Sequence, residues 1–193
     1  MNIGSIVTVI VVVLVVAALI FVYNRLVRLR NRSEAAWSQI DVQLKRRYDL
    51  IPNLVESVKG YAAHERQTLE AVIEARRQAV AASGVEEQAQ AENLLTGALR
   101  QLFALAEAYP DLKANENFLA LQEELTGTES RIAFARQFYN EQVLAYDNAL
   151  ETFPSNLVAA SFNFEPKVYF EAETESREPV KVEFGQTPPP EQS

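Results

Sequence analysis

The chain has no cysteine and a single histidine among its 193 residues. Without cysteine, it can form no disulfide bond, thiolate metal site, cysteine nucleophile or lipid-modified cysteine, and the redox compartment stays undetermined. A carboxylate-bridged di-metal centre needs Glu-x-x-His on two helices. The one histidine, His64, has Tyr61 three residues before it, so that class of site is excluded.

Catalytic motifs are missing as well. The sequence has no Gly-x-Ser-x-Gly, His-Glu-x-x-His, P-loop or Gly-x-Gly-x-x-Gly pattern. A Ser-His-Asp arrangement with His64 is formally allowed, but a histidine near a helix end more often caps the helix or binds water. We therefore expect no enzymatic activity, and we assign no catalytic, cofactor-binding or metal-binding residue.

Basic residues are scarce in the second part of the chain. The formal net charge of −8 divides into +4 over residues 24–78 and −12 over residues 79–193. The acidic bulk disfavours nucleic acid as a partner. The basic excess lies beside an apolar segment, where it would attract anionic lipid head groups or act only as a topology signal.

That apolar segment runs from Ile3 to Tyr23 without a charge. About 20 residues at ~1.5 Å each span the ~30 Å hydrocarbon core, which predicts a transmembrane helix. A cleaved signal peptide would need a basic start, a shorter apolar core and a small-residue cleavage site, and none is present. Four arginines follow the segment and none precedes it: Arg25, Arg28, Arg30 and Arg32. This asymmetry predicts a single-pass membrane protein with its N-terminus outside and its remainder in the cytoplasm.

The next stretch predicts an amphipathic helix from Ser33 to Tyr61. Its large apolar residues recur every three or four positions, which places them on one face: Trp37, Ile40, Leu44, Tyr48, Ile51, Leu54 or Val55, and Val58. Ser33 or Asn31 could cap this helix, or the anchor could continue into it unbroken. Pro52, flanked by Asp49 and Asn53, should kink the helix, either to fit its neighbours or to form a binding site.

Three further helices are expected, at about 65–82, 85–109 and 117–153. Residues 60–65 could form a turn, or one helix could run from 33 to 82; Ser83-Gly84 is a firmer stop. In the last helix, large residues recur every seven positions: Phe118, Leu125, Ile132, Tyr139, Tyr146 and Phe153. Such spacing favours close antiparallel packing, although Gly127 could interrupt it. The predicted fold is all-α: an antiparallel up-and-down helical bundle of about four long helices on one transmembrane helix.

Polar residues of the last helix suggest one structural contact. We expect Arg136 to pair with Asp41 or Asp49, and Asn140 to bond backbone carbonyls freed near Pro52. Phe134, Phe138 and Leu144 lie off the main seam of this helix. They would form an interaction patch if exposed, or they pack against a second neighbouring helix.

Beyond Pro154 the helical period is lost. Residues 168–172 and 180–184 alternate like two short strands, which would pack on the bundle or form only with a partner. The predicted organisation is an anchor at 1–24, a basic strip at 25–32, the bundle at 33–154, a tail with possible strands at 155–184 and a disordered proline-rich end at 185–193.

Several contiguous strings resemble the LemA family of bacterial membrane proteins. They are Ala36-Trp-Ser-Gln-Ile-Asp-Val-Gln-Leu-Lys-Arg-Arg-Tyr-Asp-Leu-Ile-Pro-Asn-Leu54, Tyr109-Pro-Asp-Leu-Lys-Ala-Asn-Glu-Asn-Phe118, Thr128-Glu129, Arg131-Ile132, Arg136, Tyr139-Asn140 and Phe153-Pro154. The resemblance implies an antiparallel helical bundle on one transmembrane helix in the bacterial inner membrane. It implies no established enzymatic activity and no agreed catalytic residues.

These observations lead to a membrane-anchored helical scaffold that acts by protein–protein contact. Its expected partners are the lipid bilayer, a second copy of itself and possible further membrane proteins. The alternative is an accessory subunit of a membrane protease or transporter, and an enzyme is the third and weakest reading.

Overall fold

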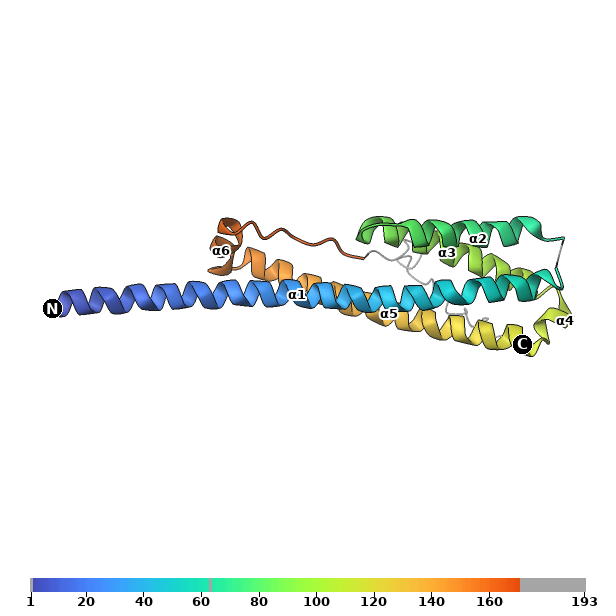
Figure 1. Cartoon of the computed structure of the whole chain (residues 1–193), viewed down its shortest axis with the longest axis horizontal. Helices are drawn as coiled ribbons and strands as arrows, with labels where there is room; N and C mark the ends of the chain where they lie inside the picture. Colours follow the sequence, from blue (N-terminus) through green and yellow to red (C-terminus); the bar gives the residue numbers. More distant parts are fainter. Residues whose placement is uncertain (1, 63, 171–193) are drawn as a thin grey trace, which may run out of the picture.

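The computed structural model describes residues 2–62 and 64–170, and helices are the regular secondary structure throughout these residues. The all-α class is confirmed for this part of the chain. The helices are α1 (Ile3–Lys59), α2 (Arg66–Ala81), α3 (Val85–Ala106), α4 (Pro110–Lys113), α5 (Glu116–Glu151) and α6 (Ser155–Ser161) (Figure 1).

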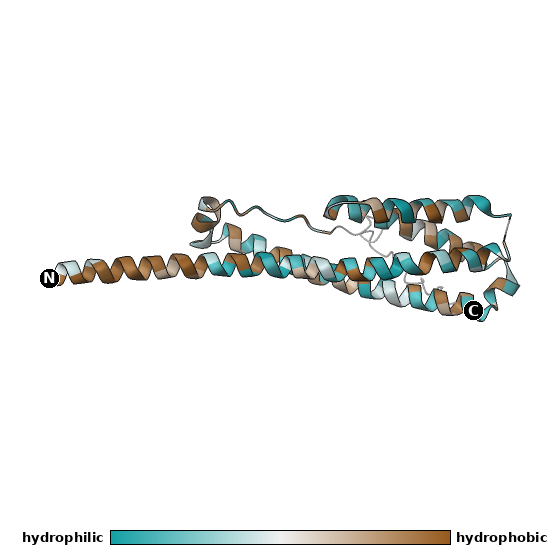
Figure 2. Ribbon diagram, viewed as in Figure 1, coloured by the Kyte–Doolittle hydropathy of each residue, from teal (hydrophilic) through white to brown (hydrophobic). Residues whose placement is uncertain are grey.

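Helix α1 is a single helix of 57 residues that begins in the apolar segment and continues into the packed body. Its most apolar stretch has a mean hydropathy of 3.3 and is entirely exposed, so it is long and apolar enough to span a membrane. Figure 2 shows this apolar part projecting beyond the other helices. Of the alternatives at Ser33, the unbroken helix is therefore correct, and α1 also continues through Pro52.

The packed body consists of α1 and α5 lying side by side, with α2 and α3 packed on each other and over the distal part of α1 (Figure 1). Buried positions on α1 recur every seven residues, at Leu26, Ser33, Ile40, Arg47 and Leu54. The expected seven-residue seam of α5 is buried at five of its six positions: Phe118, Leu125, Ile132, Tyr139 and Tyr146. Phe153 lies beyond the end of α5 and is exposed.

The breaks between helices correct several expectations. Helix α1 ends at Lys59 and α2 begins at Arg66, so the single helix over 33–82 is wrong. Gly84 precedes α3 with φ of 81°, a conformation that favours glycine. Helix α3 ends at Ala106, and Pro110 begins the short helix α4 at a position where its missing N–H costs nothing. Gly127 does not interrupt α5.

The chain after Pro154 differs most from expectation. Ser155–Ser161 forms α6, where an irregular tail was predicted, because Val158 and Ala159 pack on Leu26 and Ala149. Residues 162–170, which we call the strap, contain no strand, so the expected strand is wrong for 168–170. The expected continuation at 171–172, the second strand at 180–184 and the proline-rich end at 185–193 lie outside the described residues.

The strap is held by side chains of α5 rather than by a neighbouring strand. The Asn140 side chain bonds both the N–H and the carbonyl of Phe170, at 2.9 and 3.1 Å. The Tyr139 hydroxyl donates to the Val168 carbonyl at 2.8 Å, and the Tyr146 hydroxyl donates to the Glu165 carbonyl at 3.0 Å. These bonds satisfy the extended backbone and fix the strap on the α1–α5 pair.

Candidate functional site

A polar network lies inside the packed body where a purely apolar core was expected. Arg47 is only 3% exposed and Glu92 is fully buried. Arg47 stands seven residues from both Ile40 and Leu54, in the buried row of α1. Neither residue stands out as a site residue in the sequence. A buried charge is tolerated only with a partner and further hydrogen bonds, so the surroundings of this pair decide its role.

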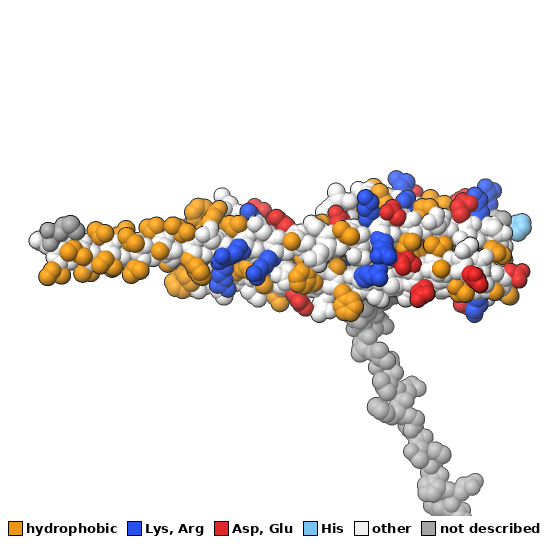
Figure 3. Space-filling model, turned by 60° about the horizontal axis from the view of Figure 1, so that its bottom comes forward, with side chains coloured by type: hydrophobic (Ala, Val, Ile, Leu, Met, Phe, Trp, Pro, Cys, Tyr) orange, Lys and Arg blue, Asp and Glu red, His pale blue; other side chains and the backbone are white. Residues whose placement is uncertain are grey.

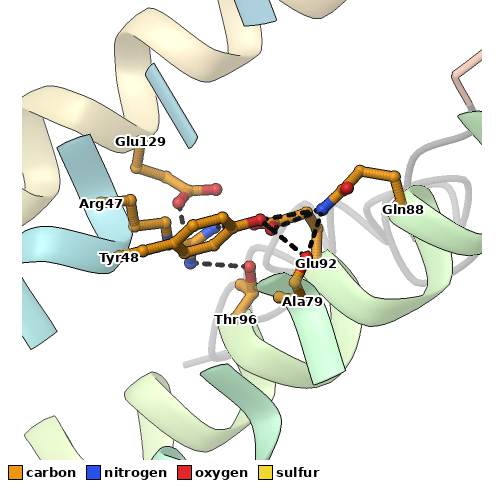
Figure 4. Close-up of polar contacts among 7 residues, drawn as sticks. All are labelled: Arg47, Tyr48, Ala79, Gln88, Glu92, Thr96 and Glu129. Atoms are coloured by element: carbon orange, nitrogen blue, oxygen red, sulfur yellow. Dashed lines mark hydrogen bonds and ion pairs between the residues drawn. The ribbon is translucent and has the colours of Figure 1, made fainter. Parts of the chain in front are cut away.

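The guanidinium of Arg47 reaches acceptors on two other helices (Figure 4). Its Nη1 donates to Oε2 of Glu92 at 3.0 Å, and its Nη2 donates to Oγ1 of Thr96 at 2.9 Å. The same Nη2 lies 3.0 Å from Oε2 of Glu129 on α5. Arg47 therefore joins α1 to both α3 and α5 through charge-assisted hydrogen bonds, the stronger kind.

The other oxygen of Glu92 faces Tyr48 and Gln88. The Tyr48 hydroxyl donates to Oε1 of Glu92, and Nε2 of Gln88 donates to the Tyr48 oxygen at 2.8 Å. Nε2 of Gln88 also reaches the carbonyl of Ala79, in the last turn of α2, at 3.1 Å. The network thus extends from α5 through α1 and α3 to the end of α2.

Burial shifts the pKa values of two of these groups, Glu92 and Tyr48. It raises the pKa of the Glu92 carboxyl above its ordinary value, and the Tyr48 hydroxyl and the Arg47 guanidinium act in the opposite direction. Burial, with the charge of Glu92, also raises the pKa of Tyr48 well above its usual value. Tyr48 therefore remains a neutral hydrogen-bond donor, and the network acts as a joint between helices.

No group of three histidine, cysteine, aspartate or glutamate side chains in the described residues could hold a metal ion. His64 is exposed in the turn between α1 and α2, at the end of the body farthest from the N-terminus (Figure 1). It lies on no helix of the network, and the structure does not bring it together with the polar groups around Pro52.

The backbone near Pro52 has a partner that was not foreseen. Because proline has no N–H, the carbonyl of Tyr48, four residues earlier, loses its helical donor. Nε of Arg76 on α2 donates to this carbonyl at 2.8 Å. The role expected for Asn140 is wrong, since its side chain is bonded to Phe170. Arg136 lies with its guanidinium carbon 4.9 Å from the centre of the Phe170 ring, and its pairing with Asp41 or Asp49 stays a prediction.

Replacing Arg76 with methionine should lower the free energy of unfolding by about 1–2 kcal/mol, because it leaves the Tyr48 carbonyl without a donor. Urea unfolding of the full-length protein in detergent, followed by circular dichroism, measures this loss. Arg77→Met is the matched control, since exposed Arg77 bonds Glu74 within its own helix. Equal stability of the two variants would show that the Arg76 bond contributes nothing.

An exposed apolar face lies elsewhere on the α1–α5 pair. Phe134 is 73% exposed, and Phe138 and Val42 are also exposed. Together with neighbouring polar residues, these three side chains line an open hollow of about 590 Å³ between α1 and α5. We call this surface the apolar hollow. Leu144 is exposed too, but it lines a separate hollow with Tyr169 and Phe170.

Of the two alternatives left open for Phe134, Phe138 and Leu144, exposure is correct, and no second helix within residues 2–62 and 64–170 covers them. The expected single patch divides in two, because Leu144 faces a different side of α5.

Residues 36–184 match the sequence model of the LemA family. This chain belongs to the LemA family. The matched region begins inside α1 and includes the polar network, the apolar hollow and the strap. The match confirms the resemblance carried by the strings around Trp37 and Tyr109.

Several known proteins are similar to this chain over most of its length. Protein LemA of Metamycoplasma hominis is 29% identical over 83% of this chain and 75% of that protein. Magnetosome protein MamQ 2 of Paramagnetospirillum magneticum is 24% identical over 91% of this chain and 74% of that protein. Magnetosome protein MamQ of Magnetospirillum gryphiswaldense is 23% identical over 86% and 70%, respectively.

Proposed function

We propose that this LemA-family protein is a membrane-anchored scaffold that acts by protein–protein contact and pairs with a second copy of itself through the apolar hollow. In this proposal α1 crosses the bacterial inner membrane once, and the long helices form an antiparallel up-and-down bundle in the cytoplasm. The observation that carries the proposal is the exposure of Val42, Phe134 and Phe138 around one hollow.

The shape of this surface suits a second copy. Phe134 projects beside a hollow of about 590 Å³ on the same face. In a two-fold pair each copy offers the same patch, so the projecting ring of one molecule can enter the hollow of the other. Large exposed apolar side chains that gather at one place mark interaction sites in soluble domains.

The anchor adds a further argument. Copies held in one membrane share the orientation of α1, and restriction to a surface raises their effective concentration. The hollow lies on the α1–α5 pair, whose α1 is continuous with the apolar segment. Two anchored molecules can therefore meet on this face with their spans side by side.

Crosslinking in native membranes tests the proposal. A photoreactive residue in place of Phe138 should give a product at twice the chain mass, identified by mass spectrometry. The control position is Leu94, an exposed leucine on α3 outside the apolar hollow. A dimer product from position 138 and none from position 94 would support pairing; no product from position 138 would contradict it.

A crosslinked product that contains a different membrane protein would favour the alternative, an accessory subunit of a membrane protease or transporter. Exchanging residues 3–23 for an unrelated apolar span separates these functions further. A cytoplasmic scaffold should keep its activity after the exchange, whereas an adaptor that works inside the membrane should lose it. The enzyme hypothesis requires that joint substitution of His64, Asp49 and Asn53 abolishes function while the protein stays folded. An unchanged phenotype would remove its best candidate site.

The proposed orientation follows from the arginines at 25–32 and predicts a labelling pattern. Because the chain has no cysteine, single cysteines can be introduced without background. In intact cells whose outer membrane has been made permeable, Asn2→Cys should react with a membrane-impermeant maleimide. Leu94→Cys should react only after the inner membrane is opened. The reverse pattern would place the body outside the cytoplasm.

A further inference from the structure

Helix α6 lies at the end of the packed body nearest the apolar segment (Figure 1). Its inner face packs on α1, where Val158 and Ala159 form a small core with Leu26. The ring of Phe162 lies 4.9 Å from that of Tyr23, the last residue of the apolar run. Phe164 lies 5.7 Å from the same ring. The chain therefore returns, after α5, to the level at which the apolar segment ends.

The outer surface of this region is strongly apolar. Phe153 is 79% exposed, Leu157 is 59% exposed and Phe162 is 62% exposed. Phe153 precedes α6, Leu157 lies on it and Phe162 follows it, so all three fall within ten residues of chain. Three large apolar side chains exposed to water within so short a stretch of chain are unfavourable. Another apolar phase is needed to cover them.

The neighbouring charges indicate which phase that is. Arg25, Arg28, Arg30 and Arg32 follow Tyr23 directly. Figure 3 shows basic side chains gathered beside apolar ones where the bare helix meets the body. The guanidinium carbon of Arg30 lies 5.6 Å from the centre of the Phe164 ring. Apolar and aromatic side chains next to a basic cluster match the boundary between acyl chains and anionic head groups.

Depth supports the same conclusion. The uncharged run from Ile3 to Tyr23, at ~1.5 Å per residue, is about as long as the hydrocarbon core is thick. With this run in the bilayer, Tyr23 lies at the membrane–water interface, where tyrosine is enriched. Phe162 touches Tyr23, so it lies at the same level.

We infer that α6, with Phe153, Leu157 and Phe162, is a second membrane contact that inserts these side chains among the anionic lipids around the end of the apolar segment. This inference rests on the proposed transmembrane anchor. It gives the body two attachments to the same leaflet, α1 and α6, while the arginines that follow Tyr23 on α1 contact the lipid phosphates. The end of α5 is thereby held at the membrane surface next to α1.

Single-cysteine labelling tests the contact in the full-length protein. Leu157→Cys carries an environment-sensitive fluorophore, and the protein is reconstituted into phosphatidylcholine–phosphatidylglycerol vesicles. Some of the lipids carry a nitroxide near the head group. Interfacial helices bury ~5–10 Å deep, so quenching at position 157 should be at least about twofold stronger than at Leu94→Cys, the control far from the membrane.

Val12→Cys, in the middle of the apolar segment, distinguishes failure of the α6 contact from failure of the proposed anchor. If position 12 is quenched by a deep nitroxide but position 157 behaves like position 94, the anchor stands and the α6 contact is overturned. If position 157 is shielded from both lipid nitroxide and aqueous iodide, a protein covers it, and lipid is the wrong partner. If position 12 is also unquenched by lipid, the proposed anchor fails together with the inference.

Discussion

Replacing Arg47 with methionine should lower the free energy of unfolding by about 3–5 kcal/mol near neutral pH, the usual cost of breaking a buried ion pair from one side. Methionine fills much of the volume of arginine, so the loss reports the charge more than a cavity. Glu92 would remain fully buried without the guanidinium that donates to its Oε2. Chemical unfolding of the full-length protein in detergent measures the change.

The loss should depend on pH. Burial already raises the pKa of Glu92, and Arg47 counteracts this, so removal of Arg47 raises the folded-state pKa further. A carboxyl whose pKa is higher in the folded than in the unfolded protein favours folding below its unfolded value, and this contribution is lost as pH rises through the folded value. The Arg47→Met variant should therefore recover stability toward acidic pH, and its deficit relative to wild type should shrink.

Two further variants test whether the loss comes from the buried Arg47–Glu92 pair. Arg46→Met removes the neighbouring arginine, which pairs with Glu124 at a half-exposed site, and should cost at most about 1 kcal/mol. Arg47→Met combined with Glu92→Leu removes both charges and should regain most of the lost stability, because replacing a whole buried pair is often neutral. A deficit of Arg47→Met that stays constant from acidic to alkaline pH would contradict the assigned role of Glu92.

Replacing Phe170 with alanine should cost about 3–4 kcal/mol, the range for truncating a buried phenylalanine. Its ring is buried against Trp37 at a centroid distance of 5.9 Å and lies under the Arg136 guanidinium. Both the packing and the cation–π contact disappear with the ring. Chemical unfolding measures the loss, with half-exposed Tyr169→Ala as the matched control.

The same variant should release the strap. Lys167 is held in place by its N–H, which donates to Oδ1 of Asp147 at 3.2 Å, and by its ammonium, 3.3 Å from Glu34. Trypsin should cut the wild-type chain after Lys167 slowly and the Phe170→Ala chain rapidly, because cleavage requires local opening. Equal cleavage of Phe170→Ala and Tyr169→Ala would show that Phe170 does not anchor the strap.

The helices were predictable because long periodic segments carry their own signal. The seven-residue spacing of Phe118, Leu125 and Ile132 is enough to predict the buried face of α5. Arg47 and Glu92 were missed because a charged residue on a helix is by default assigned to the solvated face. Their spacing was nonetheless visible, since Arg47 falls seven residues after Ile40, and Glu92 falls seven residues before Leu99.

Other features had no local signal to find. Helix α6 has only seven residues, too few to establish a period, and its shape depends on packing against Leu26, more than 130 positions earlier. The strap receives its hydrogen bonds from α5 side chains such as Asn140, 30 residues away. The donor for the Tyr48 carbonyl comes from Arg76 on another helix. Each of these three features depends on contacts between residues far apart in the chain, which local sequence patterns do not predict.

The continuity of α1 has a mechanical consequence. The 36 residues from Asn24 to Lys59 extend the helix by ~54 Å beyond the apolar segment, at ~1.5 Å per residue. Transmembrane helices tilt by ~20° on average, and that tilt moves the far end of this rod sideways by ~18 Å. Because α1 is one continuous helix from Ile3 to Lys59, a tilt or rotation of the apolar segment turns the packed body with it. With the apolar segment in the membrane as proposed, α1 acts as a lever that converts small changes of tilt in the bilayer into large displacements of the packed body.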